Sequence, residues 1–207
     1  MIQVTLRERK KEMTQNKIID IAIDLFRKQG FDLTSMEQIA TEAFIAKGTL
    51  YNYFSNKEAI IHHFMRRVIE DNEAELNVII ENNTNTHSRL LVLLKKLFEW
   101  NKSNEDIVRM HTSIRLHDYF SFTAGNEWPS NLEYILTRIF TIGQTSGDIR
   151  NDLEPKNLAL YFKLMYTVSF LQWLDNSNDH QHLKGIKQAV DLFISGAGKR
   201  SEQEAWR

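Results

Sequence analysis

Residues 45–57 combine small, polar and cationic side chains in a pattern that suits contact with a nucleic acid. Lys47, Gly48 and Thr49 offer an ammonium group, a bare backbone and a hydroxyl in succession, and Asn52 follows about one helical turn later. Such a surface lets a helix backbone approach base edges in the major groove of DNA, which is wide enough to admit one helix. The pattern predicts that these four residues contact bases.

Groups that could hold phosphates flank this segment. Two tyrosine hydroxyls and one lysine follow the small polar triplet, and a preceding helix start offers backbone amides that could bind an anion. The lysine would oppose the dipole of its own helix unless an anion is near, which favours a phosphate. Tyr53 can equally be a rim aromatic that covers the core. The predicted contacts to the DNA backbone are Thr34, Ser35, Met36, Tyr51, Tyr53 and Lys57.

Helical periodicity and capping patterns define the elements that must position these groups. Apolar residues at helical spacing predict a first helix around residues 17–26, and Gly30 with Phe31 predicts a left-handed ending in which Phe31 folds back toward Phe26. Capping boxes at Thr34–Glu37 and Ser55–Glu58 predict the starts of two further helices.

A short helix over residues 45–54 lies between those two boxes, and its apolar residues can face inward. We expect Phe26, Ile39, Leu50 and Phe54 to form the core of this region. A helix, a tight turn and a second short helix form the geometry that places a recognition helix in the major groove.

Residues 13–64 resemble the N-terminal domain of the TetR family of bacterial repressors. The resemblance rests on the residues at 18–26, Gly30-Phe31, Thr34-Ser35-Met36, Ile39-Ala40, Ala43, the run Lys47-Gly48-Thr49-Leu50-Tyr51-Asn52-Tyr53-Phe54, and Lys57-Glu58. It implies a DNA-binding domain at residues 12–72, with the helix-turn-helix at about 35–54, and an effector-binding and dimerisation domain at 73–207. It further implies a homodimer on double-stranded DNA with a palindromic operator.

Two residues depart from the family pattern. Phe44 stands where a turn glycine is usual, and Ala46 stands where a serine or threonine usually caps the recognition helix. Phe44 at positive φ would be strained by roughly 1–2 kcal/mol. A missing cap costs about 0.5–2 kcal/mol. Either the turn takes another shape, or the recognition helix is held less firmly before DNA arrives.

The rest of the chain has the pattern of a helical body. Amphipathic stretches predict helices at about 88–102, 104–118, 127–146, 155–176 and 182–197. The predicted fold is all-α, with about nine helices in a three-helix DNA-binding domain and a C-terminal helical domain. Residues 158–174 are apolar enough for burial but fall short of the roughly 20 apolar residues that span a bilayer.

The last two predicted helices carry more apolar surface than one small body can cover. Helix 155–176 is apolar nearly all round, which favours a second copy of the chain on one side. The residues predicted at this dimer interface are Leu160, Leu164, Val168, Leu171, Ile186, Val190, Phe193 and Ile194.

The body is also rich in aromatic side chains and methionine. By the family resemblance, an apolar effector would bind among these helices and shift the dimer between two shapes. The predicted pocket comprises Trp100, Met110, Ile114, His117, Phe140, Phe162, Met165, Tyr166 and Phe170.

Composition excludes several other functions. The 207 residues include no cysteine, and the histidines lack a helical pair with acidic support, so we expect no metal and no cofactor. There is no glycine-rich phosphate loop or nucleophile elbow, which argues against an enzyme. The net charge of −1 makes any DNA binding local. The cationic start, with no apolar signal-peptide core, predicts a cytoplasmic protein without membrane contact.

The sequence therefore predicts a DNA-binding transcriptional regulator, a repressor that a small, largely apolar effector releases from its operator. The alternative is a TetR-like DNA-binding protein without a small effector that recruits a protein partner. The cationic arm at residues 7–17 is open to two interpretations, a solvated and frayed end or a phosphate contact.

Overall fold

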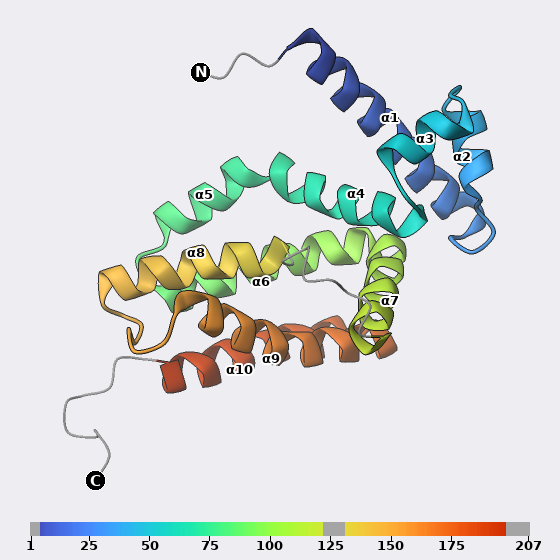
Figure 1. Cartoon of the computed structure of the whole chain (residues 1–207). Coiled ribbons are helices and arrows are strands. Elements are labelled where there is room, and N and C mark those ends of the chain that lie inside the picture. Colours follow the sequence, from blue (N-terminus) through green and yellow to red (C-terminus); the bar gives the residue numbers. More distant parts are fainter. Residues whose placement is uncertain (1–4, 122–130, 198–207) are drawn as a thin grey trace, which may run out of the picture. The chain divides into compact units, whose positions relative to one another are not determined.

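The computed structural model describes residues 5–121 and 131–197, and every regular element within those ranges is an α-helix (Figure 1). The chain divides into two compact units. The first contains α1 (Leu6–Gln29), α2 (Met36–Glu42), α3 (Lys47–Tyr53), α4 (Lys57–Asp71) and α7 (Glu105–Ser121). The second contains α5 (Glu73–Asn82), α6 (Thr86–Ser103), α8 (Asn131–Ser146), α9 (Pro155–Asn176) and α10 (Asp179–Ala197). The predicted all-α class is confirmed.

The core of the first unit forms where α1 to α4 and α7 meet. Phe26, Ile39, Leu50 and Phe54 are at most 2% exposed, which confirms their predicted place in the core. Phe31 folds back on Phe26 as expected, with ring centroids 5.1 Å apart. The other members that are at most 2% exposed are Ile18, Ile19, Ala22, Ala43, Ile60, Ile61 and Ile107.

Helix α1 begins eleven residues earlier than the apolar pattern predicted, at Leu6. Thr5 accepts a hydrogen bond from the amide of Glu8 at 3.2 Å, and the Glu8 carboxylate accepts one from the amide of Thr5 at 2.7 Å. This capping box starts a helix whose first two turns have no buried residue. The cationic arm is therefore helical and solvent-facing, and periodicity failed to find it because no apolar stripe marks it.

Helix α2 is capped one residue later than predicted. Ser35, not Thr34, accepts from the amide of Gln38 at 3.1 Å, and the Gln38 side chain accepts from the amide of Ser35 at 3.0 Å. Thr34 is 1% exposed and donates its hydroxyl to the carbonyl of Gly30 at 2.8 Å. Two overlapping capping patterns compete here, and burial of Thr34 selects the second.

Helix α4 also uses a different cap from the predicted pair of Ser55 and Glu58. The Asn56 side chain accepts from the amide of Ala59 at 2.8 Å. The predicted site of a helix start is right to within one residue, and only the capping side chain differs.

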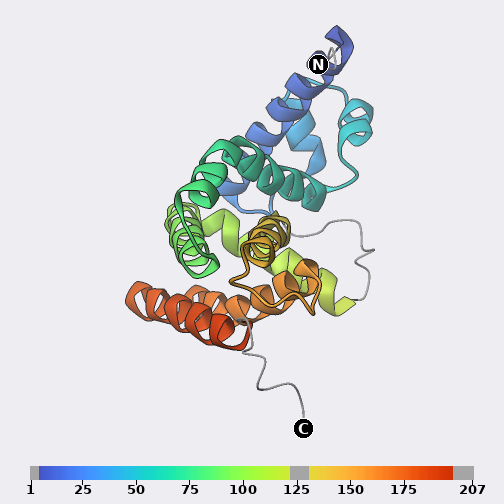
Figure 2. The same ribbon diagram turned by 90° about the vertical axis from the view of Figure 1, so that its left-hand side faces the viewer.

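The second unit is built around α8, α9 and α10, with α6 packed against α8 and α10. Figure 2 shows α9 and α10, in orange and red, lying side by side. Phe140, Phe162 and Phe193 meet at its centre, with ring centroids 5.1–6.1 Å apart. Each of these three helices therefore contributes one ring to a shared apolar core.

A close approach joins the start of α6 to the end of α8. The amide of Thr86 donates to the Asp148 carboxylate at 2.6 Å, which caps α6 from a distant part of the chain. A Cβ added at Gly143 would lie 2.2 Å from the Thr86 hydroxyl oxygen, so only glycine fits.

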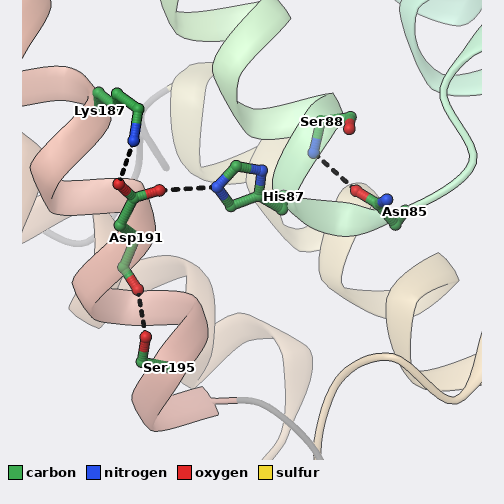
Figure 3. A network of polar contacts seen from close by, with 6 residues as sticks. All are labelled: Asn85, His87, Ser88, Lys187, Asp191 and Ser195. Atoms are coloured by element: carbon green, nitrogen blue, oxygen red, sulfur yellow. Dashed lines mark hydrogen bonds and ion pairs between the residues drawn. The ribbon is translucent and has the colours of Figure 1, made fainter.

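A polar network links the start of α6 to α10 (Figure 3). One carboxylate oxygen of Asp191 lies 2.8 Å from His87 Nε2, and the other accepts a hydrogen bond from Lys187 Nζ at 2.5 Å. Asn85 accepts from the amide of Ser88 at 2.8 Å, in the first turn of α6. The contact between His87 and Asp191 joins α6 to α10, and it leads the causes that lower the pKa of Asp191.

The predicted helices of the C-terminal part agree with α6, α7 and α9 to within three residues at each end. Helix α10 begins three residues before the predicted start, and the first residues of the helix predicted at 127–146 lie outside the described residues. Helix α7 belongs to the first unit, although the prediction placed it in the C-terminal domain. Within the described ranges, no helix has both the length and the apolar character needed to cross a bilayer.

Candidate functional sites

The exposed side of α3 carries all four residues predicted to contact bases. Lys47, Gly48, Thr49 and Asn52 are exposed, whereas Leu50 on the opposite side is fully buried. Leu50 thus anchors the helix to the core of the first unit. The arrangement leaves a small polar surface facing outward, with its smallest residue in the first turn.

Gly48 has no packing reason to be glycine. A Cβ at this position would meet no atom of the described chain within 4 Å. Glycine inside a helix is about 1 kcal/mol less favourable than alanine. The backbone at this point is therefore left bare at a small loss of stability, which suits close approach by another molecule.

Lys47 is held by an acidic neighbour on α2. Its ammonium group contacts the Glu37 carboxylate and lies 5.9 Å from the centroid of the Tyr51 ring. The hydrogen bond between Glu37 and Lys47 raises the pKa of Lys47 and lowers the pKa of Glu37. Both side chains are more than half exposed, and exposed ion pairs of this kind are weak. Lys47 can therefore exchange Glu37 for another anion at little loss.

The turn before α3 has the strained geometry that its sequence suggested. Phe44 has φ 56° and is 89% exposed. Lys17 donates to the carbonyl of Ala43 at 3.0 Å and places its Nζ atom 5.6 Å from the centroid of the Phe44 ring. Ala46 occupies the N-cap of α3 without a side-chain hydrogen bond, as predicted. The structure thus contains both departures from the family pattern. The side chain of Lys17 contacts the turn through both the Ala43 carbonyl and the Phe44 ring.

The predicted phosphate contacts are only partly available. The side chains of Thr34 and Met36 are 1% and 8% exposed and pack in the core, so the predicted phosphate contact here falls to the backbone amides at the start of α2. Ser35 is engaged in capping α2. Tyr51 is 45% exposed beside Lys47, while Tyr53 is partly buried against the core, the rim position left open by the sequence.

Lys57 finds a partner inside the protein. Its Nζ atom donates to the carbonyl of Phe31 at 2.6 Å and lies 4.4 Å from the centroid of the Phe31 ring. Lys57 therefore does not need a phosphate to offset the dipole of its helix. Lys57 instead ties the start of α4 to the loop after α1.

The residues of the predicted effector pocket are divided between the two units. Met110, Ile114 and His117 lie on α7 of the first unit, where Met110 and Ile114 pack against its core. The other predicted residues belong to the second unit. There Phe140 and Phe162 are fully buried in the central core. Other side chains pack around their rings, so the two rings do not line an open site.

A cleft of about 320 Å³ opens between α9 and α10 in the second unit. Met165 is the predicted pocket residue that borders it. Ser169, Trp173 and His182 also line it, together with exposed polar residues that include Gln181 and Lys184. Sequence reasoning missed His182, since its neighbours come from other helices.

His182 lies inside an aromatic cluster. The centroid of its ring is 4.8–6.4 Å from those of Phe98, Tyr166, Phe170 and Trp173. The indole of Trp173 donates to the Asp179 carboxylate at 3.0 Å, which anchors one wall of the cluster. Helices α6, α9 and α10 therefore together form one aromatic cluster, and the ring of His182 lies within it.

The predicted dimer surface separates into an exposed half and a buried half. On α9, Leu160, Leu164 and Val168 are 37–60% exposed, and Leu171 is partly buried. On α10, Ile194 is partly buried. The prediction that Ile186, Val190 and Phe193 lie at the interface is wrong, because they are at most 9% exposed and pack within the second unit.

Other residues extend the exposed apolar surface. Tyr161 on α9 is 53% exposed, and Leu183 on α10 is 40% exposed. We call Leu160, Tyr161, Leu164, Val168 and Leu183 the apolar face. Large apolar side chains gathered on neighbouring helices usually mark an interaction surface.

Comparison with known proteins finds a family match within the first unit. Residues 18–64 match the family described as bacterial regulatory proteins, tetR family. The chain is 22% identical over 183 residues to the fatty acid metabolism regulator protein of Bacillus subtilis (strain 168), covering 87% of this chain and 93% of that protein. It is 23% identical over 154 residues to the HTH-type transcriptional repressor KstR2 of Rhodococcus jostii (strain RHA1), covering 73% and 75%.

A solved structure shares the fold over nearly the whole chain. Thermus thermophilus FadR, a TetR-family repressor in complex with lauroyl-CoA, aligns with a TM-score of 0.74 and 20% identity, covering 93% of this chain and 100% of that one. In the described part of the chain, no group of three or more histidine, aspartate or glutamate side chains could hold a metal ion.

Proposed function

We propose that this chain, a member of the TetR family of bacterial regulatory proteins and a DNA-binding regulator, is a repressor of transcription. It binds a palindromic operator as a homodimer and leaves the operator when a small, largely apolar effector binds. The exposed side of α3 carries this proposal. It offers Lys47, Gly48, Thr49 and Asn52 outward while Leu50 anchors the helix.

The recognition step follows from the chemistry of α3. In the major groove, Lys47 donates to the oxygen and nitrogen acceptors of guanine, and the Asn52 amide matches the donor and acceptor of adenine. Thr49 reads a base through its hydroxyl or its methyl group. The bare backbone at Gly48 lets the first turn approach the base edges. Tyr51 donates its hydroxyl to a neighbouring phosphate and sets the helix in register.

Dimerisation through the apolar face supports a palindromic site. A two-fold axis pairs the same surface of two copies, so Leu164 of one protomer meets the equivalent surface of its partner. The two recognition helices then read identical half-sites one or more helical turns apart. Exposed leucines on both α9 and α10 favour this arrangement over a monomer.

Effector control is supported by two observations. The second unit contains a cleft that reaches the aromatic cluster of His182, and the solved FadR protein of similar fold is a complex with lauroyl-CoA. In this chain the effector favours a dimer shape in which the two α3 helices no longer match the operator.

The test begins with the purified full-length protein and a pool of random duplex DNA. Repeated selection of bound DNA is expected to yield an inverted repeat. Gly48→Ala is expected to weaken binding to that DNA at least about tenfold, because a methyl group blocks close approach, while raising the thermal stability of the free protein. The control is Gly196→Ala on α10, where an added Cβ also meets nothing within 4 Å.

Recovery of DNA with no common sequence contradicts the proposal. So does equal operator binding by Gly48→Ala and the native protein, since the backbone of α3 then does not approach the bases.

A further inference from the structure

Two buried polar atoms in the aromatic cluster have no hydrogen-bond partner among the described residues. They are the hydroxyl of Tyr166 on α9 and Nε2 of His182 on α10. The two side chains are 3% and 2% exposed, and their ring centroids lie 6.1 Å apart. Buried polar groups are nearly always paired, and an unpaired one reduces stability. A pair of them in one cluster points to a function that folding alone does not require.

The second nitrogen of His182 fixes what Nε2 can do. Nδ1 lies 3.1 Å from the carbonyl oxygen of Ser169 and 3.3 Å from its hydroxyl oxygen. The hydroxyl can donate or accept, but the carbonyl can only accept, so the shorter contact assigns the hydrogen to Nδ1. Burial lowers the pKa of His182, which keeps the ring neutral. Nε2 is therefore a hydrogen-bond acceptor in the neutral ring.

Tyr166 supplies the opposite function. Burial raises the pKa of its hydroxyl, which therefore remains protonated and can donate. The hydroxyl and Nε2 together offer one donor and one acceptor with no net charge. A single alcohol group on a ligand complements both, because it can donate to Nε2 and accept from Tyr166.

The backbone geometry of α9 and α10 holds this pair in place. A Cβ at Gly185 would lie 2.4 Å from the Ser169 hydroxyl oxygen, so a larger residue there would displace this hydroxyl. The close approach brings the His182 ring to the Ser169 carbonyl one turn before Gly185. The cleft between the helices is lined by Ser169, His182 and Gly185.

The walls around the pair select for an apolar, uncharged molecule. Phe98, Phe170 and Trp173 surround His182 with carbon atoms. The nearby Asp179 carboxylate is already shared by Lys102 and the Trp173 indole. Lys184 lines the cleft, but the described side chains of the aromatic cluster include no lysine or arginine, so a carboxylate enclosed by these rings would be an unpaired buried charge, which is strongly unfavourable.

We propose that Tyr166 and His182 form the polar end of an effector site that binds a neutral, mostly apolar molecule through a hydroxyl group. The ligand enters by the cleft between α9 and α10, donates its hydroxyl hydrogen to His182 Nε2 and accepts from the Tyr166 hydroxyl. Its apolar body packs against the aromatic cluster. This assignment rests on the proposed effector-controlled function and names the chemistry of its effector.

The test compares two probes of equal chain length, 1-decanol and decanoate, by thermal unfolding of the full-length protein. We expect 1-decanol to raise the melting temperature, as any ligand of the folded state does, and decanoate to have a smaller effect. Tyr166→Phe keeps the ring and removes the hydroxyl, and its expected effect is about a tenfold loss of 1-decanol affinity. Without ligand, this variant is expected to melt at the same or a higher temperature.

Tyr134→Phe is the matched control, because Tyr134 is a 57% exposed tyrosine on α8. Its 1-decanol affinity is expected to equal that of the native protein. His182→Gln gives a second arm that changes the acceptor without adding volume. Failure of 1-decanol to stabilise the native protein overturns the assignment, as does unchanged affinity in Tyr166→Phe or a marked loss of its stability without ligand.

Binding to the selected DNA separates this inference from the proposed function. If the native protein binds DNA specifically but ignores 1-decanol, the assignment of Tyr166 and His182 fails and the DNA-binding function stands. If 1-decanol binds through Tyr166 but the protein shows no sequence preference among DNAs, the proposed function fails and the site stands.

Discussion

The recognition surface of α3 and the aromatic cluster around His182 are built in opposite ways. The first is a set of exposed side chains within one short helix, with Leu50 as its fully buried anchor. The second joins residues from α6, α9 and α10 that lie up to 84 positions apart, from Phe98 to His182. A surface that meets a large external partner needs one well-anchored element, whereas a site that encloses a small molecule needs several elements packed around it.

The largest expected effect concerns the assembly that would carry both regions. Leu164→Glu puts a charge in the middle of the apolar face, and we expect the dimer to weaken at least 100-fold, or about 3 kcal/mol. Sedimentation equilibrium measures this directly. Leu33→Glu is the control, because Leu33 is 76% exposed in the first unit. If the Leu164→Glu protein dimerises as tightly as the native chain, the apolar face is not the dimer interface.

Acidification is expected to weaken the first unit through His111. Burial, followed by the charges of His62 and Arg115, lowers the pKa of His111 to about 3. Below the unfolded pKa of about 6.5, the unfolded chain binds a proton that the folded chain does not, so stability is present near pH 7 and falls as the pH decreases. The loss from pH 7 to pH 5 is at most about 2 kcal/mol, because His111 retains some solvent access.

Denaturant unfolding at the two pH values measures this loss. His111→Leu should flatten the dependence, whereas His180→Gln, an exposed histidine on α10, should leave it unchanged. A dependence that His111→Leu does not alter would assign the proton uptake to other groups.

Base reading by α3 is expected to be altered by Thr49→Ala. Loss of one hydroxyl or methyl contact should relax the preference at a single operator position by about 1.5 kcal/mol, roughly tenfold. Competition binding with singly substituted operators provides the measurement. Thr41→Ala on α2 is the control, because the Thr41 hydroxyl donates to the carbonyl of Glu37 within the same helix. An equal loss on every sequence would make Thr49 a backbone contact instead.

The smallest expected effect concerns the turn that precedes α3. Phe44→Gly relieves the positive φ and should raise the free energy of unfolding by about 1 kcal/mol. The gain is limited, because the contact of Lys17 with the Phe44 ring is lost and glycine is more flexible in the unfolded chain. Chemical denaturation checks the change. A loss of stability would show that the ring contributes more than its backbone strain costs.

The same contrast explains what could be predicted from the sequence. The residues of α3 lie close together in the chain, so helical periodicity alone placed Leu50 inward and Thr49 outward. The positive φ of Phe44 and the missing cap at Ala46 were anticipated from the family resemblance, which left open whether the turn would take another shape. The cap of α2 was not, because Ser35 and Thr34 present overlapping patterns that only burial of Thr34 separates.

Long-range packing decided the rest. The apolar residues of α10 could have faced a second copy or the protomer core, and periodicity does not distinguish the two. The structure packs Phe193 against Phe140 and Phe162, which leaves Leu160, Leu164 and Val168 of α9 exposed. His182 gained its role from neighbours that only the fold assembles.

The central claim is that α3 lies in the major groove of DNA as one of two symmetric recognition helices. Methylation of guanine N7, which faces the major groove, tests this directly on the selected DNA. The account predicts protection in two clusters related by two-fold symmetry and separated by one or more helical turns, about 10 base pairs each. Full reactivity at every guanine N7, with protection confined to adenine N3 in the minor groove, would contradict it.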